Sequence, residues 1–214
     1  MGRAALSEQE IQSFRDRLVE VATRLFVRDG HSGVTLRAIA REMGCSPMTP
    51  YRYFRDRDEI FAAVRASAYQ AFADAQEAAI TPDQSPLERL AALGEAYVTF
   101  AIESPDAYRL QFSLSQPSAD GYPEVREGEL LAWMPLLGAV QAAVASGDLE
   151  GDPQILAHLM WSSVHGLVSL HLAGKLVMGP ELDELLPHLL TTLMLGSQQR
   201  PADLVGATLQ GITT

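Results

Sequence analysis

The chain has 214 residues and a mass of 23.3 kDa, which corresponds to one or two domains and is enough to bury a sizeable core. Hydrophobic residues make up 47% and charged residues 20%, a balance that is typical of soluble globular proteins and excludes a disordered chain. The formal net charge of −11 at pH 7 argues, for the chain as a whole, against nucleic acid as a partner. The single cysteine, Cys45, excludes an internal disulfide and favours a reducing, cytoplasmic compartment.

The composition and patterning predict an all-α fold. Ala and Leu number 29 each, whereas Ile and Val together number 20, and no segment alternates between apolar and polar residues with a period of two. The first predicted helix begins with capping-box spacing at Ser7 and Glu10 and ends near Gly30. Its apolar residues recur at helical spacing and form one stripe: Ile11, Phe14, Leu18, Val21, Leu25 and Phe26.

Two short helices joined by a tight turn come next and form a candidate helix-turn-helix. Thr35 caps the first helix, and Gly44 supplies the turn between the two. Ser46 and Pro47 have the residue types that start a helix, which predicts a second helix closing at Tyr53-Phe54. A bare helix-turn-helix pattern is weak evidence, because helical hairpins are common.

The rest of the chain is predicted to form longer helices separated by clear breaks. A helix starts at Asp56 or Asp58, and Thr81–Gln84 interrupts the pattern. Further helices are expected from Ser85, from Ser104 and over 124–146, 153–174 and 180–196, with a loop at 116–123 and a loosely ordered tail at 200–214. Pro187 is expected to kink or split the last helix.

Charge is unevenly distributed between the two ends of the chain. Residues 1–65 carry 11 Arg against 9 acidic residues, a net charge of +2, and residues 66–214 carry 5 basic against 18 acidic residues, a net charge of −13. The arginines concentrate around the candidate helix-turn-helix, where residues 35–57 hold five of them against two acids. The asymmetry indicates a small basic module joined to a large acidic body. Chance clustering of solvated arginines is the alternative.

The outer face of the second short helix carries residues that suit DNA recognition. Met48, Thr49 and Arg52 share this face by their spacing, and an arginine can pair with guanine in the major groove. Tyr51 and Tyr53 flank the face, and their hydroxyls suit phosphate oxygens. The tyrosines are equally compatible with half-buried packing positions.

Residues 11–65 resemble the N-terminal domain of TetR-family transcriptional regulators. The similarity rests on the Thr-capped helix, the Ala-x-x-x-Gly turn, the Tyr-x-Tyr-Phe end of the next helix and the following Arg-Asp-x-Asp-Glu-Ile run. The resemblance implies an all-helical homodimer with a variable C-terminal ligand-binding domain. By this resemblance, the expected phosphate contacts are Thr35, Tyr51, Tyr53 and Arg57. The expected base-reading positions are Arg37, Met48, Thr49 and Arg52.

The chain departs from the family pattern at two positions. Arg57 stands where the family usually has Lys, and an arginine still binds phosphate. Pro50 lies inside the predicted recognition helix, where it removes a backbone N–H. Whether Pro50 alters the recognition helix is left open by the sequence.

The C-terminal part shows a second, weaker resemblance, to the TetR subgroup with a Trp/His/Gly signature, through Trp161, His165 and Gly166. A ligand pocket there would be lined by large apolar groups and a few polar ones. The candidate lining residues are Tyr97, Phe100, Tyr108, Phe112, Trp133, Met134, Met160, Trp161 and His165. Ordinary core packing is the alternative for each of them.

The sequence also bears on three other possible partners, which are a second copy of the chain, a membrane and a metal ion. The charge-free stretch at 153–174 and the leucine-rich stretch at 180–196 predict the homodimer interface. The polar residues within the first of them, three histidines included, argue against a membrane span. His158 and His165 are seven residues apart, but no third ligand has a convincing spacing, so neither a metal nor another cofactor is expected.

The favoured hypothesis is a DNA-binding repressor with domains at 1–65 and 66–199, which a small, largely apolar ligand releases from a palindromic operator. The alternative is a helix-turn-helix regulator without a small-molecule effector, gated by a protein or acting as an activator. An enzyme is not expected, because no nucleophile motif surrounds any Ser or Cys. Cys45 has no visible resolving cysteine for a role in redox sensing.

Overall fold

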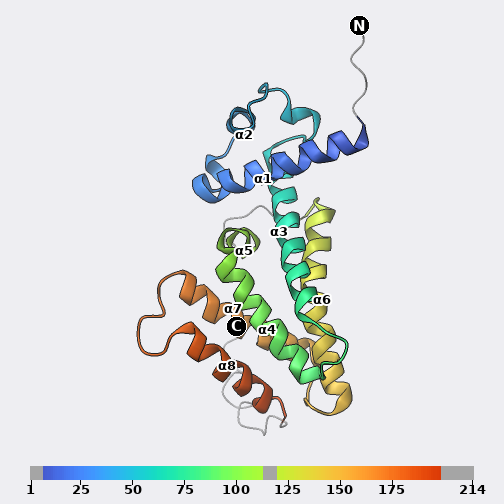
Figure 1. Cartoon of the computed structure of the whole chain (residues 1–214), viewed down its shortest axis with the longest axis vertical. Coiled ribbons are helices and arrows are strands. Elements are labelled where there is room, and N and C mark those ends of the chain that lie inside the picture. Colours follow the sequence, from blue (N-terminus) through green and yellow to red (C-terminus); the bar gives the residue numbers. More distant parts are fainter. Residues whose placement is uncertain (1–6, 113–119, 199–214) are drawn as a thin grey trace, which may run out of the picture. The chain divides into compact units, whose positions relative to one another are not determined.

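The computed structural model describes residues 7–112 and 120–198 and confirms the all-α fold (Figure 1). Within these residues there are eight α-helices, one short 3-10 helix and no strand. In chain order they are α1 (Glu8–Gly33), α2 (Leu36–Glu42), η1 (Pro50–Arg52), α3 (Arg57–Ala79), α4 (Pro86–Glu103), α5 (Pro105–Phe112), α6 (Pro123–Ser146), α7 (Pro153–Leu172) and α8 (Leu182–Gly196).

The chain divides into two compact units. The first comprises the chain up to Asp74 together with Glu103–Ala132, and the second comprises Ala75–Ile102 and the chain from Trp133 onward. Helices α3 and α6 therefore each contribute residues to both units. The predicted boundary of the DNA-binding domain at residue 65 remains a prediction, and the predicted tail at 200–214 lies outside the described residues.

The core of the first unit forms between α1, α2, α3 and α5. Four members of the predicted α1 stripe are buried there, whereas Phe14 packs at the margin and Ile11 is exposed. The other buried side chains include Ile39 of α2, Ile60 and Val64 of α3, and Leu110 of α5. The periodicity of α1 therefore identified the buried face of this helix, except in its first turn.

Local capping decides where the helices begin. Ser7 and Glu10 form a reciprocal capping box at α1, with Ser7 N donating to Glu10 Oε2 at 2.8 Å. Ser85 and Glu88 repeat this arrangement at α4. Such pairs satisfy backbone N–H groups that have no partner within the helix, which fixes the first residue of the helix. The predicted starts of these two helices are confirmed.

The second unit packs α4, α6 and α7 around its own apolar core. Leu90 and Leu93 of α4 meet Val140 and Ala143 of α6 and Ala157 of α7. Helix α8 packs against α7 and, through Leu190, against α4. It runs from Leu182 to Gly196 with Pro187 inside it, so Pro187 does not split this helix, and a kink there stays a prediction.

Two helices have the length and apolar composition to cross a membrane. They are α6 and α7, and 28% of the most apolar window of each is buried within the structure. Length and composition alone are weak evidence for a span, because core helices of soluble proteins pass the same test. Both helices supply residues to the apolar core of the second unit, which accounts for part of their composition.

Gly94 makes the close packing of α4 against α8 possible. A Cβ atom at this position would lie 2.7 Å from Leu190 Cδ2, closer than real carbon contacts allow. We therefore expect Gly94→Ala to lose most or all of the gain of about 1 kcal/mol that alanine normally brings within a helix, because the end of the Leu190 side chain must move aside. Urea denaturation followed by circular dichroism measures the difference.

Gly138 provides the matched control on α6. A Cβ atom there would have no heavy atom within 4 Å, and the residue lies inside a helix. Gly138→Ala should therefore leave stability unchanged or raise it by up to about 1 kcal/mol. Equal effects of the two substitutions would contradict the assignment of Gly94 as a close-packing position.

Candidate nucleic-acid interface and ligand cavity

The helix-turn-helix begins with a short, well-capped α2. Thr35 Oγ1 accepts a hydrogen bond from Ala38 N at 3.1 Å, which confirms the predicted cap. At the other end Cys45 N donates to Ala40 O at 2.9 Å and Gly44 N donates to Arg41 O at 3.1 Å. This pair of bonds is a Schellman motif, and it requires the positive φ of +67° that Gly44 adopts.

The predicted recognition helix is not an α-helix, and this part of the prediction is wrong. Residues 47–49 form turns, and only Pro50–Arg52 are helical, as the 3-10 helix η1. An α-helix capped by Ser46 needs an N–H on residue 50 to bond Ser46 O, and proline has none. Thr49 N bonds Ser46 O instead, at 2.8 Å, so the segment winds more tightly from its start.

Side chains from the core hold this short segment in place. Pro50 and Phe54 are buried, and Phe54 belongs to the core of the first unit. Arg15 of α1 lies over the Phe54 ring, with its guanidinium carbon 4.1 Å from the ring centre, and donates to the carbonyl of Tyr53. Sequence reasoning missed this role of Arg15, because its position on the first helix indicates only a solvated arginine.

The segment presents its remaining side chains to solvent. Met48 and Tyr51 are 67% and 50% exposed, Arg52 is exposed, and Thr49 is half-buried. The predicted base-reading positions of this segment therefore lie on one accessible stretch of chain.

Some arginines of the first unit are paired with acids, and others are exposed without such a partner among the described residues. Arg24, Arg28 and Arg55 are engaged by the carboxylates of Glu20, Asp29 and Glu59 respectively. The side chains of the exposed Arg37, Arg41 and Arg52 make no hydrogen bond or ion pair within the described residues. Positive charge at the helix-turn-helix is therefore left without local neutralisation, as binding to a polyanion requires.

Three of the predicted phosphate-contacting residues also have structural partners. The Thr35 hydroxyl oxygen accepts the cap bond, which leaves its proton available to donate. The Tyr53 ring stacks on Phe14, with ring centres 4.3 Å apart. Arg57 Nε lies 3.3 Å from Asp58 Oδ1, so part of its charge is balanced within α3. Only Tyr51 among the four predicted phosphate contacts is highly exposed and without such a partner.

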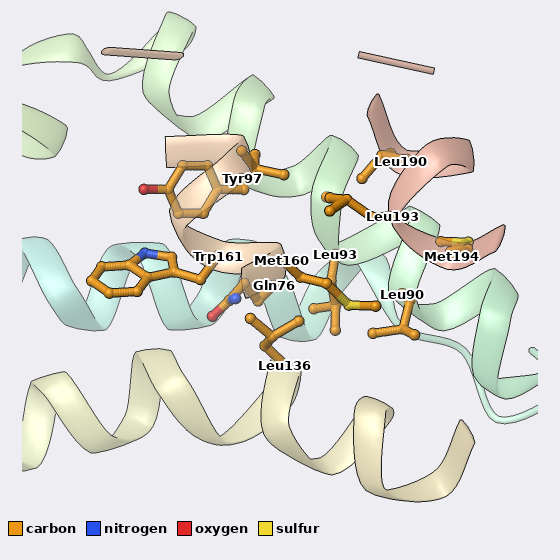
Figure 2. A pocket seen from close by; sticks show the side chains of 12 residues that line it. Gln76, Leu90, Leu93, Tyr97, Leu136, Met160, Trp161, Leu190, Leu193 and Met194 are labelled. Atoms are coloured by element: carbon orange, nitrogen blue, oxygen red, sulfur yellow. The ribbon is translucent and has the colours of Figure 1, made fainter. Parts of the chain in front are cut away.

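The second unit contains a small apolar cavity between α3, α4, α6, α7 and α8, shown in Figure 2. Its volume is about 40 Å³, which is enough for a few water molecules and less than a typical small-molecule ligand occupies. No lining residue carries a formal charge. The lining consists of Gln76, Leu90, Leu93, Gly94, Tyr97, Leu136, Met160, Trp161, Val164, Leu190, Leu193 and Met194.

The structure brings three of the nine predicted ligand-binding residues to this cavity: Tyr97, Met160 and Trp161. Trp133 packs against His158 instead, with ring centres 4.5 Å apart, and Met134 is exposed. Phe100 is buried, but it does not line the cavity. Tyr108 and Phe112 pack against each other on α5 in the first unit.

His165 joins the cavity wall through a chain of polar contacts. Tyr97 Oη and His165 Nδ1 are 2.9 Å apart, and Ser169 Oγ lies 3.3 Å from His165 Nε2. Burial lowers the pKa of His165, because desolvation disfavours the charged imidazolium. His165 is therefore neutral at pH 7 and supplies no positive charge beside the cavity.

Gln76 of α3 is a cavity residue that sequence reasoning did not single out. It is 3% exposed, and its Oε1 has no hydrogen-bond partner among the described residues. The only signal in the sequence is a glutamine among the alanines of a predicted helix, which is as easily read as a solvated position.

The described residues hold no group of three or more His, Cys, Asp or Glu side chains that converges as metal ligands do. His158 and His165 have separate partners, because His158 Nδ1 lies 2.7 Å from Gln154 O. A second and more open hollow of about 590 Å³ lies where α4 and α7 end and α8 begins. Its polar lining comes from His171, Glu181 and Asp183, and none of the predicted ligand-binding residues reaches it.

Two sequence models of known families match the chain, and together they span most of it. Residues 18–64 match the bacterial regulatory proteins of the tetR family, and residues 90–193 match a tetracycline repressor-like C-terminal domain. The chain belongs to the TetR family of transcriptional regulators. The Trp/His/Gly subgroup is named by neither match and stays a prediction.

Individual relatives agree with this assignment. The HTH-type transcriptional regulator Rv1816 of Mycobacterium tuberculosis is 24% identical over 204 residues, covering 82% of this chain and 86% of its own. A Rhodococcus sp. RHA1 protein of unknown function has a structure that superposes with a TM-score of 0.75 at 30% identity, covering 86% of this chain and 95% of its own. A TetR-family regulator from Marinobacter aquaeolei VT8 shares the fold, with a TM-score of 0.72 at 21% identity over 91% of this chain and 100% of its own.

The lowered pKa of His165 predicts how the stability of this TetR-family protein depends on pH. Because its pKa is lower in the folded than in the unfolded state, the unfolded chain binds more protons as pH falls through about 6.5. His165 therefore subtracts stability as pH falls below about 7. Replacing it by Gln should make the loss of melting temperature between pH 8 and pH 5.5 smaller than in wild type.

His188 serves as the control, because it is exposed and lies on the neighbouring helix α8. His188→Gln should keep the wild-type dependence of melting temperature on pH. A His165→Gln protein with an unchanged or steeper pH dependence would contradict the assignment of a half-buried, neutral imidazole.

Proposed function

We propose that this TetR-family regulator is a homodimeric repressor that binds a palindromic DNA operator and is released by a small, largely apolar ligand. DNA binding rests on the predicted contacts Thr35, Arg37, Met48, Thr49, Tyr51, Arg52, Tyr53 and Arg57. Ligand binding rests on the cavity of the second unit, with Tyr97, Met160 and Trp161 from the predicted set and Gln76 in addition.

The observation that carries the proposal is the group of unpaired arginines. Arg37, Arg41 and Arg52 have no ionic partner among the described residues, and they lie on α2 and η1, two elements that contact each other. The chain has a net charge of −11 and 27 acidic residues that could pair with these arginines. Arginines that stay unpaired in such a chain favour a binding role over an ordinary solvated surface. They suit phosphate and guanine as ligands.

The 3-10 geometry limits how this segment can read bases. Hydrogen-bonding side chains in the segment come from the exposed Tyr51 and Arg52 and the half-buried Thr49, which span less than two turns of chain. We therefore infer a short contacted half-site. A homodimer would place two such segments one helical turn of DNA apart, about 34–36 Å, or a multiple of it.

An exposed apolar stripe on α7 supports the homodimer. Ile155 and Leu159 are 61% and 53% exposed, and Leu170 is also exposed on the same face. Gly166 lies between them on that face, where no heavy atom would contact an added Cβ within 4 Å. A stripe of this kind is stabilised when a second copy covers it, and the small residue permits close approach of a helix.

The test of DNA binding compares wild type with Arg52→Ala by fluorescence anisotropy. The DNA is an operator duplex selected by wild type from random sequence, and unlabelled random DNA is the competitor. Arg52→Ala should weaken specific binding by about 10- to 100-fold, as loss of a guanine contact does. The effect on competitor binding should be much smaller.

Arg24→Ala is the matched control, because Arg24 lies on α1 and is bound by Glu20. It should bind the operator as wild type does. Failure of the wild-type protein to enrich any sequence from the random pool would overturn the proposal, and so would equal losses for Arg52→Ala and Arg24→Ala.

The test of the dimer interface is a charge placed on the α7 stripe. Leu159→Glu should shift the protein from dimer to monomer in sedimentation velocity at micromolar concentration, because the carboxylate must be desolvated in the interface. Leu131→Glu alters an equally exposed leucine on α6 and should remain dimeric. A Leu159→Glu dimer of unchanged stability would place the interface elsewhere.

A further inference from the structure

The side chains that line the cavity of the second unit differ between its two ends. Gln76, Tyr97 and Trp161 lie toward one end, and Leu90, Leu190 and Met194 lie toward the other (Figure 2). An occupant that matches this wall would have a polar group at the first end and an apolar body extending toward the second.

The amide of Gln76 is the group that demands a partner. Its oxygen is fully buried and accepts no hydrogen bond from any described residue. Leaving such a group unpaired costs free energy, so proteins rarely tolerate one without water, strain or a ligand to explain it. Gln76 lines the cavity, so a molecule that widens the cavity can reach this oxygen and supply the missing donor.

The charges around the cavity limit what that molecule can be. None of the lining side chains is ionised at neutral pH, and His165, which is bonded to Tyr97, is neutral. A carboxylate or phosphate would lose its hydration without gaining a cation, and a protonated amine would find no carboxylate. The cavity therefore selects against both signs of charge.

We propose that the cavity takes an uncharged, mainly apolar molecule whose hydroxyl or amide N–H donates to Gln76 Oε1. This inference rests on the proposed function, in which the same cavity holds the releasing ligand, and it specifies the chemical class of that ligand. Gln76 is then the residue that selects for a polar group on the ligand, and the leucine and methionine side chains of the wall accommodate its apolar body. Flexible methionine side chains at Met160 and Met194 provide room for expansion beyond the present volume.

The experiment uses three six-carbon probes with the free, full-length protein: hexan-1-ol, 1-chlorohexane and hexanoate. Hexan-1-ol has a neutral donor, 1-chlorohexane has none, and hexanoate is anionic at pH 7.5. Binding is followed through the tryptophan fluorescence, since Trp161 lines the cavity, and through the shift in melting temperature. Wild type should bind hexan-1-ol at least tenfold more tightly than hexanoate.

The variant Gln76→Leu removes the acceptor at nearly constant volume. It should weaken hexan-1-ol binding by roughly tenfold, the usual effect of losing one buried hydrogen bond, and leave 1-chlorohexane binding unchanged or tighter. Gln76→Met repeats the test with an unbranched side chain in case leucine disturbs the packing. Gln141→Leu is the control, because Gln141 is an exposed glutamine on α6.

Each outcome decides the proposal. An unchanged ratio of hexan-1-ol to 1-chlorohexane affinity in Gln76→Leu and Gln76→Met overturns the role of Gln76, and tighter binding of hexanoate overturns the neutral class. Absence of binding by all three probes at millimolar concentration overturns the cavity as a site for this class. Because these titrations contain no DNA, a failure here is distinct from a failure of the proposed function, which the anisotropy assay with Arg52→Ala detects separately.

Discussion

The shape of the DNA-facing segment depends on its anchoring to the core, because its own backbone hydrogen bonds are few. A 3-10 helix of three residues cannot hold itself in water, since short helices lack the cooperativity that stabilises long ones. Burial of Pro50 and Phe54 and the contacts of Arg15 provide the support instead. The positions of Met48, Tyr51 and Arg52 therefore follow from packing between α1, α2 and α3.

This constraint explains why the arginines of the first unit have different roles although they look alike in the sequence. Arg15 is half-buried and acts through its planar guanidinium, which stacks and donates to a carbonyl, as lysine could not. Arg55 sits one turn before Glu59 and is neutralised by it. Arg52, in the 3-10 turn, makes no ion pair among the described residues.

The sequence was a reliable guide where local chemistry decides the structure. Capping boxes at Ser7 and Ser85, the Thr35 cap and the positive φ of Gly44 each depend on a few neighbouring residues, and all were predicted. The start of the recognition segment was mispredicted because Ser46-Pro47 is a good helix start and Pro50 a poor continuation. Pro187 shows the opposite error, because packing of α8 against its neighbours maintains a helix that a local rule would divide.

The cavity could be anticipated only in outline, since its lining converges from five helices whose relative positions no local pattern encodes. Aromatic and methionine residues on α4 and α7 were obvious candidates, but Trp133, Met134 and Phe100 show that large side chains also serve core and surface. Gln76 went unnoticed because a glutamine in an alanine-rich helix carries no sign of burial. Its unpaired oxygen becomes visible only when the helices have been brought together.

The size of the cavity has a consequence for how a ligand could control DNA binding. A volume of about 40 Å³ is too small for the molecule proposed, so the state described here and the occupied state must differ in the packing of the second unit. A ligand shifts an equilibrium only by its difference in affinity between two states. A ligand that fits only when the cavity has opened binds the open state more tightly than the closed state, and this provides the difference in affinity. The tight contact of Gly94 with Leu190 is then a natural point of change, because the Leu190 side chain both fills the space beside α4 and lines the cavity.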